Sequence, residues 1–332
     1  MSYHKYLLPF TLGCSLLAGC QSNNSDDSSA CAGDQQSVTT SDQRTLCVSV
    51  ATEAQAPFPE GFYAARVSHV VSLSDVNGNP VDVTTDPVIT NVSQHLMMTM
   101  NNGHMHTSPH NHDADLSRAN EGVYTLTAYY VMASAMADGM PMGVWDYTVN
   151  ITDSGAGGTL DAHFTPDVKM VMGSNIFSAK ASNAGDTWTN SSDLTKPRNY
   201  TVWLDAISAK AGGAHDLTLF VSTEDMLHNG DSMNHGSFPS VYTGLTLYGP
   251  VPAGGGAQTS MTIDTVSVEV SNDGGLSWQI LSEDGEGVYS GSGLSGFTAG
   301  SQATLDVRVT VNGLEMQTAS AAYPQLVFTT PN

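Results

Sequence analysis

The chain has 332 residues, of which 32 are Asp or Glu and only 10 are Lys or Arg, so its formal net charge is −22. This excess of negative charge disfavours nucleic acids and anionic lipid headgroups as partners. The length allows two or three compact domains of ordinary size, because domains typically contain about 50 to 200 residues.

The amino-terminal end resembles the export signal of a bacterial lipoprotein. Lys5 precedes an apolar run, Tyr6–Ala18, that is too short to span a membrane but is typical of a signal sequence. Leu17-Ala18-Gly19-Cys20 matches the lipobox, in which the cysteine receives a diacylglycerol anchor. We therefore expect cleavage after residue 19 and lipidation of Cys20. The alternative is an ordinary secretory signal with an incidental cysteine.

The expected anchor places the protein in the cell envelope. Gln21 follows Cys20 where lipoproteins retained in the inner membrane carry aspartate, so the resemblance implies the outer membrane. Residues 20–55 are interpreted as a lipidated tether, because 22–43 are rich in small polar residues and cannot bury a core. In an oxidising compartment we expect Cys31 and Cys47 to form a disulfide. A metal site made from these two thiols is the alternative.

The rest of the chain has an all-β pattern of short β-branched and aromatic runs between turn residues. We predict two or three Ig-like β-sandwich domains: residues 56–154, residues 155–255 and residues 256–332. The middle segment could instead extend the first sandwich. The predicted strands are Tyr63–Leu73, Val88–Met100, Gly122–Val131, Val144–Thr152, Tyr200–Ala206, Leu217–Ser222, Ser240–Leu247, Thr265–Ser271, Trp278–Ser282 and Ala303–Val311.

One short motif in the last segment resembles an Asp-box hairpin. Residues 271–278 read S-N-D-G-G-L-S-W, with Asp273 placed to organise a tight turn and Trp278 to pack beneath it. Sialidases carry several such boxes, one per propeller blade, whereas this chain has one box and no blade repeat. We interpret it as a structural hairpin.

Histidine and methionine are concentrated between His95 and His112. Thioethers favour Cu(I) and imidazoles bind copper or zinc, so this mixture points to copper, with zinc as the alternative. Strand alternation puts Met98 and Met100 on one face, and would add His104 and His106 unless the chain turns at 101–103. The predicted loop ligands are His104, Met105, His106, His110 and His112.

Further methionines extend this prediction. Pro141 keeps its neighbours extended, so Met140 and Met142 should face the same way and complete a thioether face with Met98 and Met100. A possible second site combines Met226, His228, Met233 and His235. Other methionines (Met97, Met132, Met170, Met261, Met316) are interpreted as core packing, and His69, His95, His163 and His215 as surface or hydrogen-bonded histidines.

Residues 62–152 resemble the YtkA-like/FixH-like family of exported β-sandwich domains. The resemblance rests on Met98-Thr99-Met100 with the His-rich loop, on Gly122-Val123-Tyr124, and on Met140-Pro141-Met142-Gly143-Val144-Trp145. It implies an Ig-like fold, a link to copper handling or copper-enzyme assembly, and Met100, His104, His106, Met140 and Met142 as neighbours of a site. The longer His loop and about 175 further residues depart from the family pattern.

Catalytic motifs are missing from the sequence: it has no G-x-S-x-G elbow, no H-E-x-x-H and no glycine-rich phosphate loop. We therefore expect a non-enzyme. The sequence predicts an envelope lipoprotein that binds copper for sequestration or delivery, with a copper donor or acceptor in the envelope as its partner. The alternative is a tethered Ig-like interaction or surface-structure protein without a metal role.

Overall fold

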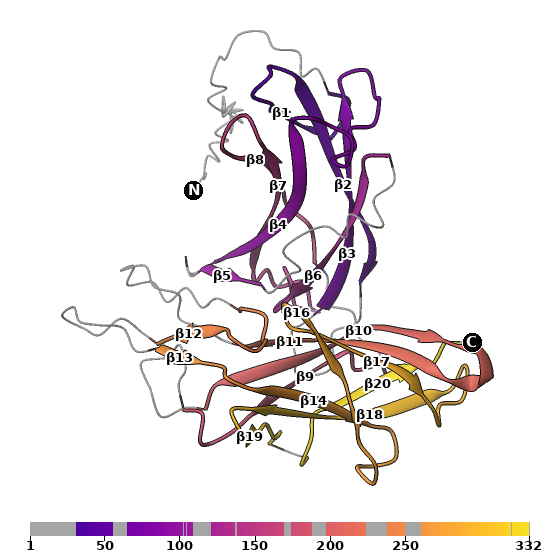
Figure 1. Ribbon diagram of the computed structural model, residues 1–332. Helices are drawn as coiled ribbons and strands as arrows, with labels where there is room; N and C mark the ends of the chain where they lie inside the picture. The colour runs from indigo at the N-terminus through magenta and orange to yellow at the C-terminus, as the bar shows by residue number, and fades with distance from the viewer. Residues whose placement is uncertain are drawn as a thin grey trace, which may run out of the picture.

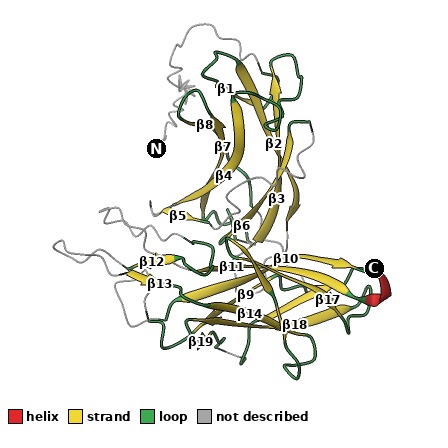
Figure 2. Ribbon diagram, viewed as in Figure 1, coloured by secondary structure: helices red, strands yellow, loops and turns green. Residues whose placement is uncertain are grey.

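The computed structural model describes residues 31–55, 65–101, 103, 105–108, 121–136, 138–168, 174–187, 197–223, 238–249, 260–319 and 321–331. These residues form antiparallel β-sheets with one short 3₁₀ turn, η2 (Ala211–Gly213) (Figure 2). The all-β prediction is confirmed. No helix in the described part of the chain is long and apolar enough to cross a membrane.

The first sandwich packs two four-stranded sheets around one core. One sheet has the order β1-β2-β3-β6 and the other the order β5-β4-β7-β8. The strands are β1 (Gln36–Thr39), β2 (Thr45–Gln55), β3 (Ala65–Asp75), β4 (Ile89–Met100), β5 (Met105–Thr107), β6 (Val123–Tyr130), β7 (Gly143–Asp153) and β8 (Gly158–Phe164).

Alternating side chains on β4 and β7 build much of this core. Leu96, Met98, Trp145 and Tyr147 are all fully buried, while the residues between them lie on the outer face of the sheet. This alternation follows from the two-residue period of a strand, which sends successive side chains to opposite faces. The register of β4 on β7 is therefore set by burial, because a shift by one residue would expose the entire inner row.

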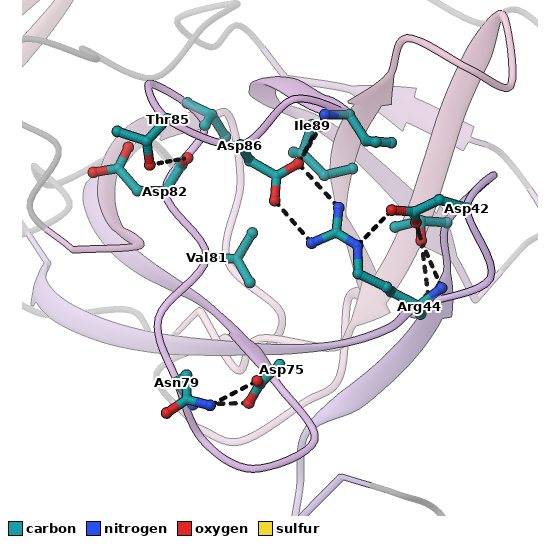
Figure 3. A network of polar contacts seen from close by, with 12 residues as sticks. Asp42, Arg44, Asp75, Asn79, Val81, Asp82, Thr85, Asp86 and Ile89 are labelled. Atoms are coloured by element: carbon teal, nitrogen blue, oxygen red, sulfur yellow. Dashed lines mark hydrogen bonds and ion pairs between the residues drawn. The ribbon is translucent and has the colours of Figure 1, made fainter.

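The end of the first sandwich that lies far from the second is closed by a polar network (Figure 3). The Arg44 guanidinium donates to both carboxylate oxygens of Asp86, at 2.8 and 3.0 Å, and to Asp42 at 2.7 Å. Asp86 also accepts the backbone N–H groups of Val88 and Ile89. The hydrogen bonds from Arg44 hold the pKa of Asp86 at about 2. Since Arg44 precedes β2 and Asp86 precedes β4, the pair ties the two sheets together.

Two more contacts close the same end. Cys31 and Cys47 are joined by a disulfide, the pairing expected from the sequence. The Asp153 carboxylate at the end of β7 accepts the Ser41 N–H at 2.6 Å and the Ser41 hydroxyl at 2.7 Å. Residues 31–44 therefore belong to the fold of the first sandwich.

The second sandwich pairs a five-stranded sheet, β16-β17-β11-β10-β9, with a sheet in which β18 lies between β14 and β19 and also pairs with β20. β15 adds to β14, and β12 pairs with β13 separately. The strands are β9 (Ser178–Ser182), β10 (Asn199–Ala209), β11 (His215–Thr223), β12 (Thr246–Tyr248), β13 (Ser260–Thr262), β14 (Val266–Ser271), β15 (Gln279–Ile280), β16 (Ser282–Gly285), β17 (Val288–Leu294), β18 (Gln302–Val311), β19 (Leu314–Glu315) and β20 (Gln325–Thr329).

Aromatic rings and an ion pair join the two sandwiches, which lie one above the other in Figure 1. Tyr129 from β6 stacks on Phe220 from β11 with ring centroids 4.2 Å apart, and Trp203 lies 5.3 Å from the same tyrosine. Asp205 of β10 accepts hydrogen bonds from Arg66 Nε and the Tyr129 hydroxyl, both at 2.8 Å. Burial raises the pKa of Tyr129 well above its usual value. Both the apolar stack and the polar cluster fix the junction.

The structure corrects the expected domain boundaries. Residues 36–55, assigned to the tether, contain β1, which pairs with β2, and β2, which pairs with β3. The boundary expected near residue 155 falls in the β7–β8 hairpin, where Asp153 pairs with Gly158. The boundary expected near 255 separates strands of one sheet, because Phe220 of β11 pairs with Val288 of β17. The described residues thus form two large cores, the first built from residues up to 168 and the second from residues 177 onward.

The predicted strands recur with shifted ends, except that most of 240–247 is irregular and only β12 forms there. The prediction missed β1, β2, β5, β8, β9, β13, β17, β19 and β20. Most of these are short or carry many polar residues, so their apolar alternation is weak; tertiary pairing stabilises them.

Candidate metal site at the Met-rich edge

The strand β5 folds back on β4 and brings the start of the His-rich segment beside the Met-rich end of β4. Gly103, with φ of 82°, lies in the turn, and its N–H donates to the Met100 carbonyl at 2.9 Å. Met98 is registered with His106. The chain therefore turns instead of continuing the strand, and cross-strand pairing, not continued alternation, brings His106 beside Met98.

A second Met-rich segment lies against the other side of the same strand end. Met100 pairs with Gly143 at the start of β7, and the Asn101 side-chain amide donates to the Pro141 carbonyl at 2.7 Å. Met142 is half-buried and packs against the first core, whereas Met140 is 59% exposed. Met140 follows a tight turn, where its carbonyl accepts the Met136 N–H at 2.8 Å, and Pro141 bridges Ala135. The expectation that Met140 and Met142 face the same way stays a prediction, but the two side chains differ in exposure.

Met98 occupies the core instead of an accessible thioether face. It is fully buried, and an added Cβ at Gly143 would lie 2.7 Å from Met98 Cε and 2.6 Å from the Thr99 carbonyl oxygen. Met98 and Met100 share a face as expected, but that face packs between the sheets, with Met100 only half-buried at its end. Close packing against Gly143 therefore makes Met98 a core residue.

The remaining predicted ligands divide into two groups. Met105 is half-buried and lies opposite Thr99 in the register. The His106 side chain and all atoms of His104, His110 and His112 lie outside the described residues, as do the lipidation site Cys20 and the possible second site of Met226, His228, Met233 and His235. Among the described side chains, no three from His, Cys, Asp or Glu converge closely enough to hold a metal ion as they stand.

The sandwich end that carries this edge also faces the junction. The Ser108 hydroxyl, just after β5, donates to the Tyr129 carbonyl, and Tyr129 stacks on Phe220 of the second sandwich. Figure 1 shows β5 at the end of the first sandwich nearest the second. The Met-rich edge (the segments 97–100, 105–106 and 140–142) is therefore held beside a packed interface.

Two of the four histidines expected to be surface or hydrogen-bonded residues are buried in the cores. His69 Nε2 lies 2.7 Å from the Tyr130 hydroxyl, and its ring lies 4.2 Å from that of Tyr147. Burial lowers the pKa of His69 to about 4, so the ring is neutral at physiological pH. His215 is buried with its ring edge-on to Phe297. These contacts are consistent with core packing.

The other two histidines, His95 and His163, lie near one another on the outer face of the β5-β4-β7-β8 sheet, which the sequence interpretation did not anticipate. His95 and Met97 alternate with the buried Leu96 and Met98, so the period-two pattern already placed them on one face. The sequence did not reveal that β4 pairs with β7 and β7 with β8, and this pairing brings together His95 and His163, about 70 positions apart.

Comparisons with models of known protein families and with curated protein sequences give no match, so the resemblance of residues 62–152 to the YtkA-like/FixH-like domains stays a prediction.

Proposed function

We propose that this chain is a cell-envelope lipoprotein that binds copper at the Met-rich edge, for sequestration or delivery. The observation that carries the proposal is the fold-back of β5 on β4, with Gly143 paired to Met100 on the opposite side. Three Met- or His-bearing segments become neighbours through this pairing. Thioether and imidazole ligands together favour Cu(I), with zinc as the competing ion.

Half-buried methionines suit such a site, because an ion at the edge is partly shielded from water while it can still be exchanged. Met100 and Met142 occupy neighbouring positions beside Gly143, and Met105 lies on β5 opposite the exposed Thr99, on the outer side of the same edge. The adjoining His104, His106, His110 and His112 would supply imidazoles. The negative net charge of −22 favours the approach of cations over anions.

An anaerobic Cu(I) competition titration tests this proposal. A chain that begins at Gln21 keeps both cores, which use only residues from 38 onward. We expect stoichiometric binding that weakens by at least about tenfold when the four loop histidines are changed to Ala, and again in Met100→Leu/Met142→Leu, since loss of even outer-shell support costs about 10- to 100-fold.

The matched control is Met261→Leu, the same substitution at a half-buried methionine of the second sandwich. It should leave the affinity unchanged. Binding no tighter than that of a generic Met-rich peptide, or equal losses in all variants, would reject the copper proposal. Anchoring is tested separately: Cys20→Ala should release the full-length protein from the membrane fraction.

A further inference from the structure

The outer face of the β5-β4-β7-β8 sheet carries a second group of potential metal ligands. They lie on the opposite side of the sheet from the buried Met98. Along β4, His95 and Met97 alternate with buried Leu96 and Met98. Along β7, Asp146 and Thr148 alternate with the inward-facing Trp145 and Tyr147, although Thr148 is itself little exposed. The side chains between the buried ones therefore point away from the core.

Strand pairing arranges these side chains in two adjacent rows. His95 pairs with Thr148, and Thr148 pairs with His163 on β8, so two imidazoles flank one threonine. Met97 pairs with Asp146 in the next row. Directly opposed residues have Cβ atoms about 4.5 to 5.5 Å apart. Both imidazoles are therefore within side-chain reach of the space above Thr148.

Contacts within this group show that the side chains lean over the threonine. The Asp146 carboxylate oxygens lie 3.1 and 3.2 Å from His163 Nδ1, and the Thr148 hydroxyl lies 3.2 Å from the same nitrogen. Thr148 is only 7% exposed although it lies on the outer face, so its neighbours cover it. The His95 ring is half-buried beside this group.

His95 is influenced by two carboxylates of the neighbouring strands, Asp146 on β7 and Asp161 on β8. Burial lowers the pKa of His95, while the nearby Asp146 and Asp161 carboxylates act in the opposite direction. The ring is thus close to both acids.

We propose that His95, His163 and Asp146 form a surface site for a borderline divalent cation, Cu(II) or Zn(II), on the outer face of the first sandwich. Two imidazole nitrogens and a carboxylate are a donor set that such ions accept. As built, the three groups do not converge, so binding requires His163 to turn toward His95 above Thr148. The His163 side chain is 61% exposed and that of Asp146 47%, so both have room to rotate once the contact between them opens.

This site does not depend on the Cu(I) proposal, and its test separates the two. The protein to use is the chain from Gln21 with His104, His106, His110, His112, His228 and His235 changed to Ala, which removes the other non-core histidines. We expect it to bind about one equivalent of Cu(II). Its electron paramagnetic resonance spectrum should show nitrogen couplings from two imidazoles, and Zn(II) should compete for the ion.

Three further substitutions in that background give the decisive comparison. His163→Ala and Asp146→Asn should each weaken binding at least about tenfold, and His163→Ala should remove one of the two imidazole couplings. Asp161→Asn is the matched control: it removes a nearby charge, and Asp161 already accepts a hydrogen bond from Asn150 at 2.8 Å. It should change the affinity by less than about threefold.

Absence of Cu(II) binding in the histidine-depleted chain would overturn the proposal, as would binding that His163→Ala leaves intact. Because the altered side chains are largely exposed, circular dichroism spectra and unfolding midpoints should stay at their parent values, which excludes misfolding as the cause of a loss. A positive result here with a negative Cu(I) titration would reject only the Met-rich edge.

Discussion

The two sandwiches share an all-β architecture but differ in what holds them together. The first core contains four large polar-tipped rings, two of which, Tyr130 and Tyr147, contact the buried imidazole of His69, and a disulfide with an inter-sheet ion pair closes its far end. The second core is mainly aliphatic and has no disulfide among its described residues. The first sandwich should therefore respond to redox state, and to pH between 7.5 and 5.0 more strongly than the second.

Removal of the disulfide tests this difference with the largest effect. Cys31 and Cys47 are 16 positions apart, and closing a loop of that length is worth about 3 kcal/mol in the chain-entropy model. Cys31→Ser/Cys47→Ser should lower the free energy of unfolding of the first sandwich by about that amount. In a native-state hydrogen-exchange experiment, the backbone amides of β2 and β3 should become less protected. Equal loss of protection in β18 would contradict the comparison.

Acidification should give the next largest effect. Folding lowers the pKa of His69 from 6.5 to about 4, so the unfolded chain binds a proton more readily between these values. Stability from this group is complete above about pH 6.5 and is lost as the pH falls toward 4. Between pH 7.5 and 5.0 the loss is about 2 kcal/mol.

The measurement is the free energy of unfolding of the first sandwich at both pH values, for the parent and for His69→Gln. The variant should lose this component of the pH dependence, because its side chain does not titrate. An unchanged slope in His69→Gln would assign the pH response to other groups. Protection of β18 serves as the internal reference.

The smallest effect is expected in the second sandwich, at the turn after β14. Asp273 accepts hydrogen bonds from the Ser271 and Ser277 hydroxyls and from the Leu276 and Ser277 N–H groups, which hold its pKa well below the usual range. Asp273→Asn should speed amide exchange at 276 and 277 with little change in global stability. Asp284→Asn, at another exposed acid, is the control; faster exchange throughout β14 would mean a larger role.

This turn also shows what the sequence could predict. The spacing of Ser271, Asp273 and Trp278 specifies a local structure, and the structure contains it: Trp278 Nε1 donates to the Gly275 carbonyl at 3.1 Å. The inner rows of β4 and β7 were predictable for the same reason, since alternation of apolar residues is a local signal. The disulfide was predictable because few cysteines remained to pair.

Local sequence patterns could not predict which distant strands pair with one another. Residues 36–55 were assigned to the tether together with the polar segment 22–43, and only the pairing of β1 with β2 and of β2 with β3 reveals them as strands. The close approach of Gly143 to Met98, 45 positions away, could not be predicted from either strand alone. The proximity of His95 and His163 required the register of three strands, which no window of sequence contains.

The stacked rings at the junction have a mechanical consequence for the whole molecule. Parallel rings such as Tyr129 and Phe220 resist separation, and the contacts of Arg66 and Tyr129 with Asp205 resist twisting about the stack. The two sandwiches should then tumble with a single rotational correlation time. A paramagnetic ion attached to the first sandwich would keep a constant distance from the strands of the second, and its relaxation effects would measure how the two sandwiches are oriented.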